Sequence, residues 1–209
     1  MLKQIFKLGR CNYCCLSCCR IARSSNLKNI IMNKLLLVFV SVVLFLSTTS
    51  FTNPEPPVSE GINWMSWEEA VAANEKEPRK IMVDLYTHWC GWCKVMDKKT
   101  FSDKAVIDKL NKEFYAVKFD AEQKEDIQYA GKTFTFIKGE RKGGVHELAY
   151  SLVNGKMSYP TIVYLNEKFE RISISPGYKE IPDLINELEF ASGEHYLKGS
   201  FEKFLKEKN

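Results

Sequence analysis

Apolar residues that recur every three or four positions predict helices along much of the chain after residue 60. Ser66 followed by Glu69 is a capping-box sequence, which marks the start of the first helix. Ser102 or Asp103 can cap the third helix. The expected helices cover residues 66–76, 93–100, 103–113, 146–153, 181–190 and 200–208.

Short apolar or alternating runs between these helices predict strands. The run 81–86 is almost entirely apolar, which is typical of a strand buried on both faces, and Asp84 is its one charged residue. A turn is expected at 166–168. The expected strands cover residues 81–86, 114–119, 132–137, 161–165 and 169–175. Helices and strands in this order indicate an α/β domain with a central mixed sheet flanked by helices.

The N-terminal region contains a candidate export signal. Residues 32–50 have the layout of a secretory signal peptide, with a short basic start, an apolar run at 35–46 and a small polar exit at 47–50. The alternative is an uncleaved segment that anchors the protein in a membrane. The twelve residues of the run fall short of the roughly 20 that span a bilayer. We therefore expect cleavage after Ser50 and an exported, periplasmic protein.

The predicted signal peptide separates an upstream extension from a spacer and a folded domain. Residues 1–31 form an upstream extension that precedes Met32, the natural start of a signal peptide, and we expect no function for its five cysteines. A metal-binding or palmitoylated tail is the alternative for these cysteines. Residues 51–60 are a Pro-containing spacer, and residues 61–209 form the folded domain.

The basic residues of the N-terminal stretch offset the net negative charge of the rest of the chain. The whole chain has a formal net charge of +4, yet residues 1–54 contain seven Lys or Arg and no Asp or Glu. The remainder has 23 basic and 26 acidic residues, which removes the electrostatic case for nucleic-acid binding. With 45% apolar and 27% charged residues, the chain is neither disordered nor collagen-like.

Only two cysteines, Cys90 and Cys93, lie beyond residue 54, and their C-x-x-C spacing is typical of redox or metal chemistry. They follow a predicted buried strand and open a predicted helix. Unpaired backbone N–H groups and the positive end of the helix dipole stabilise a thiolate at such a position. We therefore assign Cys90 as the attacking sulfur and Cys93 as the thiol that resolves the mixed disulfide.

The motif Trp-Cys-Gly-Trp-Cys-Lys, within residues 83–94, resembles the active-site segment of the thioredoxin family. The resemblance covers most of residues 61–191. It implies a thioredoxin fold with an insertion at about 122–157, before the cis-proline loop, and a C-terminal helical extension at 192–209. Four further positions agree with the family in order along the chain, namely an acid, a lysine, a cis-proline loop and a glycine, at Asp84, Lys118, 158–161 and Gly177.

The sequence departs from the family's pattern in two places. Gly91 and Trp92 stand where typical thioredoxins have Gly-Pro and disulfide isomerases have Gly-His. The 41 residues between Lys118 and Pro160 exceed what a minimal thioredoxin has there. This length resembles that of the longer, exported thioredoxin-like proteins of Bacteroidetes. The insertion is either a specificity element or a plain structural elaboration.

The resemblance also implies roles for residues around the cysteines. Asp84 is expected to accept the proton of Cys93 through water, with a raised pKa, and Lys118 to modulate that acid. A structural, hydrogen-bonded carboxylate is the alternative. His88 is a candidate for tuning the Cys90 thiolate, because the histidine that disulfide isomerases carry inside the motif is absent here. A merely solvated loop histidine is the alternative.

The resemblance implies client contacts for four residues around the cysteine pair. If Pro160 is cis, as in the family, the backbone of Tyr159 can pair with an extended client beside Cys90. Trp89 and Trp92 form a candidate apolar patch for unfolded clients. Burial of Trp92 against the domain is the alternative.

Together these assignments predict an exported thiol-disulfide oxidoreductase that reduces protein or peptide disulfides through a redox-active Cys90–Cys93 pair and needs no cofactor. Because exported compartments are oxidising, we expect a membrane electron-shuttle partner to keep it reduced. The alternatives are a disulfide donor or isomerase, a peptide-binding module with permanently bridged cysteines, and a metal carrier that uses both cysteines and His88. Two thiolates and one loop histidine are an incomplete metal site. Clients and oligomeric state are not predicted.

Overall fold

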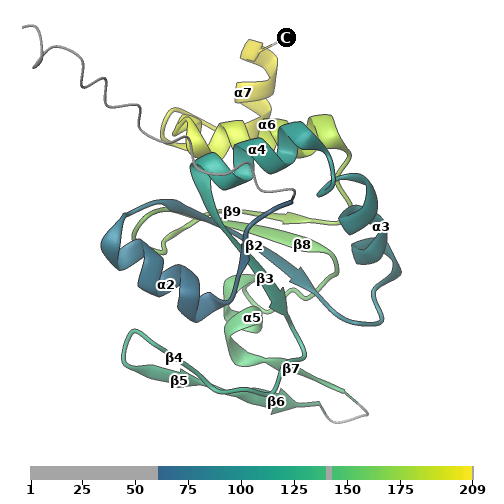
Figure 1. Ribbon diagram of the computed structural model, residues 1–209, viewed down its shortest axis with the longest axis vertical. Coiled ribbons are helices and arrows are strands. Elements are labelled where there is room, and N and C mark those ends of the chain that lie inside the picture. Colours follow the sequence, from purple (N-terminus) through teal and green to yellow (C-terminus); the bar gives the residue numbers. More distant parts are fainter. Residues whose placement is uncertain (1–60, 140–142, 209) are drawn as a thin grey trace, which may run out of the picture. The chain divides into compact units, whose positions relative to one another are not determined.

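The computed structural model describes residues 61–139 and 143–208, with a five-stranded sheet at the centre (Figure 1). Strands β1, β3 and β2 are parallel to one another, whereas β2 pairs antiparallel with β8, and β8 with β9. The predicted mixed α/β sheet is therefore confirmed. In sheet order the strands are β1 (Trp64–Met65), β3 (Phe114–Asp120), β2 (Lys80–Tyr86), β8 (Thr161–Leu165) and β9 (Arg171–Pro176).

Helices cover both faces of this sheet (Figure 1). One apolar cluster includes side chains of α2 (Trp67–Lys76) and α5 (Glu147–Leu152). The other includes side chains of α3 (Gly91–Lys99), α4 (Lys104–Glu113) and α6 (Ile181–Ser192). Helices on both faces leave β2 buried from Lys80 to Leu85, as its apolar run predicts.

The alternation of side chains along β2 decides which face its charged residue meets. Ile81, Val83 and Leu85 belong to the cluster with α2 and α5, whereas Met82 belongs to the cluster with α3, α4 and α6. Successive residues of a strand point to opposite faces. Asp84 therefore points to the face that α3 covers.

Side-chain caps mark the helix starts. The Ser66 Oγ accepts the Glu69 N–H at 3.1 Å, and the Glu69 Oε2 accepts the Ser66 N–H at 2.8 Å, so the predicted capping box is confirmed. Asp103, rather than Ser102, caps α4, because its Oδ1 accepts two backbone N–H groups of the first turn.

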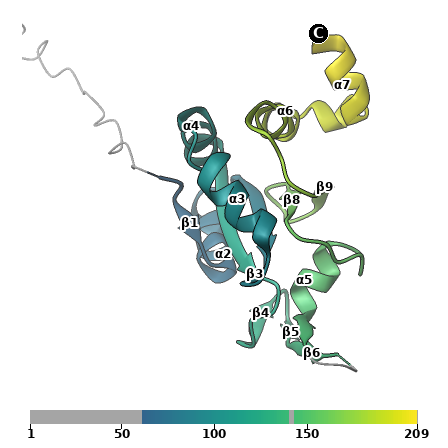
Figure 2. The same ribbon diagram turned by 90° about the vertical axis from the view of Figure 1, so that its right-hand side faces the viewer.

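Between β3 and α5 the chain forms two hairpins, so the single strand expected at 132–137 is wrong. β4 (Ile127–Tyr129) pairs with β5 (Lys132–Phe134), and β6 (Phe136–Lys138) pairs with β7 (Gly144–His146). The break falls at Thr135, whose carbonyl accepts the Glu147 N–H at 2.8 Å. Figure 2 shows both hairpins at the end of the domain away from α6. Strands of three residues are too short for a clear alternation in the sequence.

His146 ties this insertion to the end of β3. The imidazole is buried, its Nδ1 accepts the Leu148 N–H at 3.2 Å, and its Nε2 lies 3.1 Å from the Glu125 carbonyl oxygen. The His146 N–H donates to the Ala121 carbonyl oxygen at 2.7 Å, one residue after β3. Burial lowers the pKa of His146, which favours the neutral ring that can accept at one nitrogen and donate at the other.

One expectation about the C-terminal third needs adjustment, and another is confirmed. β9 begins at Arg171 rather than 169, because Phe169 has a left-handed φ of 61° in a turn where its N–H donates to the Asn166 carbonyl oxygen at 2.9 Å. The C-terminal extension continues from α6 through a 3₁₀ turn, η1 (His195–Leu197), to α7 (Phe201–Lys208). The expected helix at 200–208 is confirmed.

No helix among residues 61–139 and 143–208 is long and apolar enough to cross a membrane. The predicted extension at 1–31, signal peptide at 32–50 and spacer at 51–60 lie outside the described residues. Export and the domain boundaries therefore stay predictions.

Candidate active site

Cys90 and Cys93 form a disulfide at the start of α3. Cys90 is the N-cap residue, and its Sγ lies 3.1 Å from the Cys93 backbone nitrogen, whose N–H it accepts. Cys90 is 4% exposed and Cys93 is 3% exposed. Burial in this disulfide-bonded form therefore does not separate an attacking sulfur from a resolving one, and the assignment depends on position along the helix.

The position of Cys90 favours a thiolate once the disulfide is reduced. The first turn of α3 contains no acidic side chain, so the positive end of the helix dipole is not neutralised within that turn. Backbone N–H groups of the first turn lack helical partners and can donate to a sulfur at the N-cap, as the Cys93 N–H does. Both effects lower a thiol pKa at this place.

Asp84 is the buried acid of the site. It is 1% exposed, and its Oδ2 accepts a hydrogen bond from the Lys118 Nζ at 2.6 Å. Its Oδ1 has no hydrogen-bond partner in the described part of the chain. Burial raises the pKa of Asp84 from 3.8 to about 6, although the Lys118 charge opposes the shift. An unpartnered oxygen with this pKa is suited to take up and release a proton near neutral pH.

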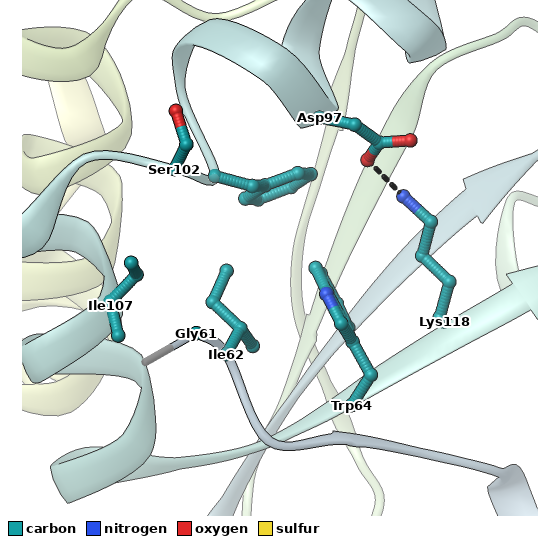
Figure 3. Close-up of a pocket in the computed structure, with 8 residues that line it drawn as sticks. Gly61, Ile62, Trp64, Asp97, Ser102, Ile107 and Lys118 are labelled. Atoms are coloured by element: carbon teal, nitrogen blue, oxygen red, sulfur yellow. Dashed lines mark hydrogen bonds and ion pairs between the residues drawn. The ribbon is translucent and has the colours of Figure 1, made fainter. Parts of the chain in front are cut away.

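Lys118 has a second carboxylate partner, Asp97 (Figure 3). Burial alone would lower the pKa of Lys118, but Asp84 and Asp97 together raise it, so the ammonium stays charged. The Nζ also lies 4.9 Å from the Trp64 ring centroid and 5.1 Å from that of Tyr86, within cation–π range. Sequence reasoning missed Asp97. Its one signal was the helical spacing of four residues from Cys93.

The Lys118–Asp97 pair lines a cavity of about 440 Å³. Figure 3 shows Trp64, Ile62 and Ser102 around this cavity, with Ser102 in the connection between α3 and α4. Asp84 is inaccessible, but its partner Lys118 reaches this space, where Asp97 is exposed. Lys118 therefore links the buried acid to an accessible surface.

One exposed tryptophan precedes the cysteine pair and another lies between the two cysteines, and each contacts a tyrosine. Trp89 is 65% exposed, and its ring meets Tyr159 edge-on at 5.7 Å between centroids. Trp92 is 63% exposed, so its burial against the domain is excluded, and its ring lies 5.5 Å from that of Tyr178. The Trp89 Nε1–H donates to the Glu122 Oε2 at 3.0 Å. Glu122 and Tyr178 were missed by sequence reasoning, because their roles appear only in these contacts.

The Tyr159–Pro160 peptide bond is cis. The Pro160 carbonyl oxygen accepts the Gly177 N–H at 2.8 Å, which joins this loop to the residue after β9. Burial, followed by the nearby charges of Glu122 and Asp120, raises the pKa of Tyr159 to about 12. The phenol is therefore neutral at physiological pH.

His88 pairs with Asp120 at the end of β3. Its Nε2 lies 3.1 Å from the Asp120 Oδ2, and its ring meets Tyr86 edge-on at 5.7 Å. The tuning of Cys90 by His88 gains no support from these contacts. Within the described residues, no group of three or more His, Cys, Asp or Glu side chains is arranged to hold a metal ion.

The sheet order, the disulfide at a helix start and the adjoining cis-proline loop define a thioredoxin-fold protein. The model of the family described as "Protein of unknown function, DUF255" (Thioredox_DsbH) matches residues 55–191. This match covers more than half of the chain, and the chain belongs to that family. A solved thioredoxin-fold protein from Helicobacter pylori agrees in fold, with a TM-score of 0.50 and 14% identity, covering 73% of this chain and 89% of that chain.

Curated relatives match over shorter stretches. Human spermatogenesis-associated protein 20 is 27% identical over 84 residues, which are 40% of this chain and 10% of that protein. The thiol:disulfide interchange protein DsbD of Pseudoalteromonas atlantica is 41% identical over 49 residues, 23% of this chain and 8% of that protein. The matched stretches thus span about a tenth of the length of these relatives.

We expect Asp84→Asn to stabilise the oxidised protein at pH 7.5 and to have little effect at pH 4. Because the pKa is raised, the folded protein holds a proton on Asp84 that the unfolded chain releases above 3.8, and this stability is lost as the pH rises through about 6. The shift corresponds to a stabilisation of up to about 3 kcal/mol in the variant at pH 7.5. Urea unfolding at both pH values measures it.

Asp97→Asn is the matched control for this experiment. It removes the exposed carboxylate partner of the same lysine and leaves the buried acid in place. Its effect should stay below about 1 kcal/mol, as for other exposed ion pairs. Equal free energies of unfolding for wild type and Asp84→Asn at both pH values would contradict the burial argument.

Proposed function

We propose that this protein is a thiol-disulfide oxidoreductase in which Cys90 is the nucleophile and Cys93 the resolving thiol. The observation that carries the proposal is the Cys90–Cys93 disulfide at the start of α3, with the buried Asp84 on the sheet face that α3 covers. The 41% identity to part of a thiol:disulfide interchange protein supports the same reaction class.

The reductive cycle starts from two thiols. The Cys90 thiolate attacks one sulfur of a client disulfide, the client S–S bond breaks, and the other client sulfur leaves as a thiolate. Cys93 then loses its proton and attacks the Cys90 sulfur, which breaks the mixed disulfide and releases the second client thiolate. Two electrons pass to the client, and the protein ends with the Cys90–Cys93 disulfide.

Asp84 receives the Cys93 proton in this scheme. Its free Oδ1 can accept that proton through a water molecule, and a pKa of about 6 allows the proton to leave again near neutral pH. Lys118 holds the other oxygen and lowers the cost of the charged state. Clients would pair with the Tyr159 backbone, next to the cis Pro160, and contact the exposed rings of Trp89 and Trp92.

Reduction of client disulfides is the direction that we favour. Trp92 stands between the cysteines where a cation would stabilise the reduced thiolate, and its uncharged ring contacts Tyr178. The Nε2 of His88, two residues before Cys90, lies 3.1 Å from the Asp120 Oδ2. A weakly stabilised thiolate makes the reduced form less favoured and the potential more negative. The electrons would come from a membrane electron-shuttle protein that donates them by thiol–disulfide exchange.

The exchange assignment predicts different behaviour for the two cysteine variants. Cys93→Ser should accumulate mixed disulfides with client proteins, because nothing resolves the adduct, whereas Cys90→Ser should not trap clients. Non-reducing gels with mass spectrometry of the trapped sulfur measure this. Equal trapping by both variants would contradict the assignment of Cys90 as nucleophile and Cys93 as resolving thiol. A Cys90 pKa no lower than the value of about 8.5 for a free thiol would contradict it too.

A second prediction concerns the redox potential of the Cys90–Cys93 pair. Equilibration against glutathione should give a potential below about −180 mV, towards the value of about −270 mV for thioredoxin. Trp92→His should raise it by roughly 30 mV, because about 1.4 kcal/mol of thiolate stabilisation corresponds to that change, while Trp92→Phe should leave it unchanged.

Other outcomes of this titration select the alternatives. A wild-type potential near about −120 mV would make the protein a disulfide donor. A disulfide that stays intact at every glutathione ratio would favour a peptide-binding module with a permanent bridge.

Export is the third part of the proposal. It is supported by the apolar run at 35–46 and its small polar exit. We expect the mature protein to begin near Phe51, to be found in the periplasm and to lack the five upstream cysteines. N-terminal sequencing of the protein from its native host tests this. Recovery of residues 1–31 in the folded protein would refute it.

A further inference from the structure

The turn between β9 and α6, residues 177–180, contacts α3 at both of its ends. At the first turn of the helix, the ring centroids of Trp92 and Tyr178 are 5.5 Å apart. At the C-cap, the Thr100 Oγ1 donates to the Lys179 carbonyl oxygen at 2.7 Å, and Thr100 is buried. Two neighbouring residues of the β9–α6 turn therefore contact the start and the end of the helix that begins at the cysteine pair.

The placement of α3 depends on such contacts because its own packing is slight. Within this nine-residue helix, only Cys93 and Met96 are buried. The Asp97–Lys118 pair holds the helix towards β3, and the β9–α6 turn holds it at its ends. Stabilisation of the Cys90 thiolate requires that first-turn N–H groups stay directed at its sulfur. A displaced α3 would weaken exactly these bonds.

Hydrogen bonds fix the course of the β9–α6 turn itself. Gly177 has a left-handed φ of 87°, which favours a residue without a Cβ, and its N–H donates to the Pro160 carbonyl oxygen at 2.8 Å. The Lys179 Nζ donates to the Pro176 carbonyl oxygen at 2.9 Å, so the lysine side chain folds back over the turn. This side chain is only 16% exposed, and its ammonium therefore needs a partner of opposite charge.

Glu187 on α6 supplies that charge and joins the turn to the sheet. Its Oε1 lies 3.8 Å from the Lys179 Nζ and accepts a hydrogen bond from the Ser175 Oγ of β9 at 2.6 Å. Its Oε2 accepts a hydrogen bond from the Tyr164 Oη of β8 at 3.1 Å. The Glu187 side chain is 12% exposed. One carboxylate thus connects α6, two strands and the β9–α6 turn.

Packing alone does not account for a carboxylate at this place. Glu187 stands three residues after Leu184 and four before Ala191, and both of these belong to the apolar cluster that α3 shares. Residues at this spacing lie on one face of a helix, so Glu187 is on the core side of α6. An apolar side chain would pack there at no loss of stability, because burying an ion pair gains little. Its contacts therefore indicate a task in holding the turn.

We propose that Glu187 is a positioning residue for the cysteine pair. It anchors the β9–α6 turn, the turn holds α3 at both ends, and the first-turn N–H groups of α3 thereby stay directed at the Cys90 sulfur. The inference rests on the proposed oxidoreductase function and adds a residue from another helix to it. Loss of the anchor slows the reaction of Cys90 with any electrophile, including a small one that makes no contact with a client surface.

The test measures the pH dependence of Cys90 alkylation by iodoacetamide, which reports the thiolate fraction. The full chain carries Cys93→Ser, and mass spectrometry follows the one peptide that contains Cys90. We expect Glu187→Gln to raise the midpoint of the pH profile and to lower the rate constant at pH 7 roughly threefold. The amide has no charge for Lys179 and only one acceptor atom. Thr100→Val, which removes the hydroxyl at the end of α3, should act in the same direction.

Asn74→Ala is the matched control for a general loss of stability. Asn74 is also largely buried, and its side chain joins two other segments: it donates to the Glu167 carbonyl oxygen at 2.7 Å and accepts the Arg79 N–H at 2.9 Å. It lies on α2, whose buried side chains belong to the other apolar cluster. Asn74→Ala should lower the free energy of unfolding in urea and leave the midpoint of the pH profile unchanged. The double variant of Glu187→Gln with Thr100→Val should shift the midpoint by less than the sum of the single shifts, because both act through the turn.

Each other outcome overturns the inference in a recognisable way. An unchanged midpoint in folded Glu187→Gln would remove the positioning role, and an unchanged midpoint in Thr100→Val would do so if Glu187→Gln does not fold. A shift of equal size in Asn74→Ala would assign the effect to lost stability. Full additivity in the double variant would exclude the route through the turn. A midpoint of about 8.5 or higher before any change at Glu187 would instead contradict the role of Cys90, and the proposed function would fall together with the inference.

Discussion

The buried pairing of Asp84 with Lys118 is the interaction on which the rest of the site depends. A carboxylate without water or a partner is costly in an apolar interior. The parallel register of β2 and β3 places Lys118 directly opposite Asp84, so the Lys118 ammonium donates a hydrogen bond to the Asp84 carboxylate. Asp97 on α3 holds the same ammonium. Two central strands and the helix that begins at the cysteine pair are thereby joined through one lysine side chain.

Around this centre, segments distant in the sequence form the surface beside the cysteine pair. Trp89 comes from the motif, Glu122 from the start of the insertion and Tyr159 from the cis-proline loop, yet their side chains contact one another in series. The hairpins of the insertion lie further away and are tied to β3 through His146. The insertion therefore touches the candidate site through its first residues.

Features with a local cause were predictable from the sequence. The capping box at Ser66 and the buried run of β2 depend on residues a few positions apart. The same holds for the order of elements, which predicted a mixed sheet flanked by helices. The pairing of Asp84 with Lys118 was accessible only through resemblance, because 34 residues separate the two.

The tertiary structure alone decided the features that depend on distant or very short segments. Asp97, Glu122 and Tyr178 became site residues because folding brings each to a partner that sequence spacing does not reveal. The two hairpins have strands of three residues, which are too short to show an alternation in the sequence. Thr135 belongs to neither hairpin, because its carbonyl oxygen accepts a hydrogen bond from the first residue of α5. The sequence by itself determined the reactive motif and its place at a helix start. Its surroundings followed from packing across the sheet, since contacts between distant segments leave no periodic signal along the chain.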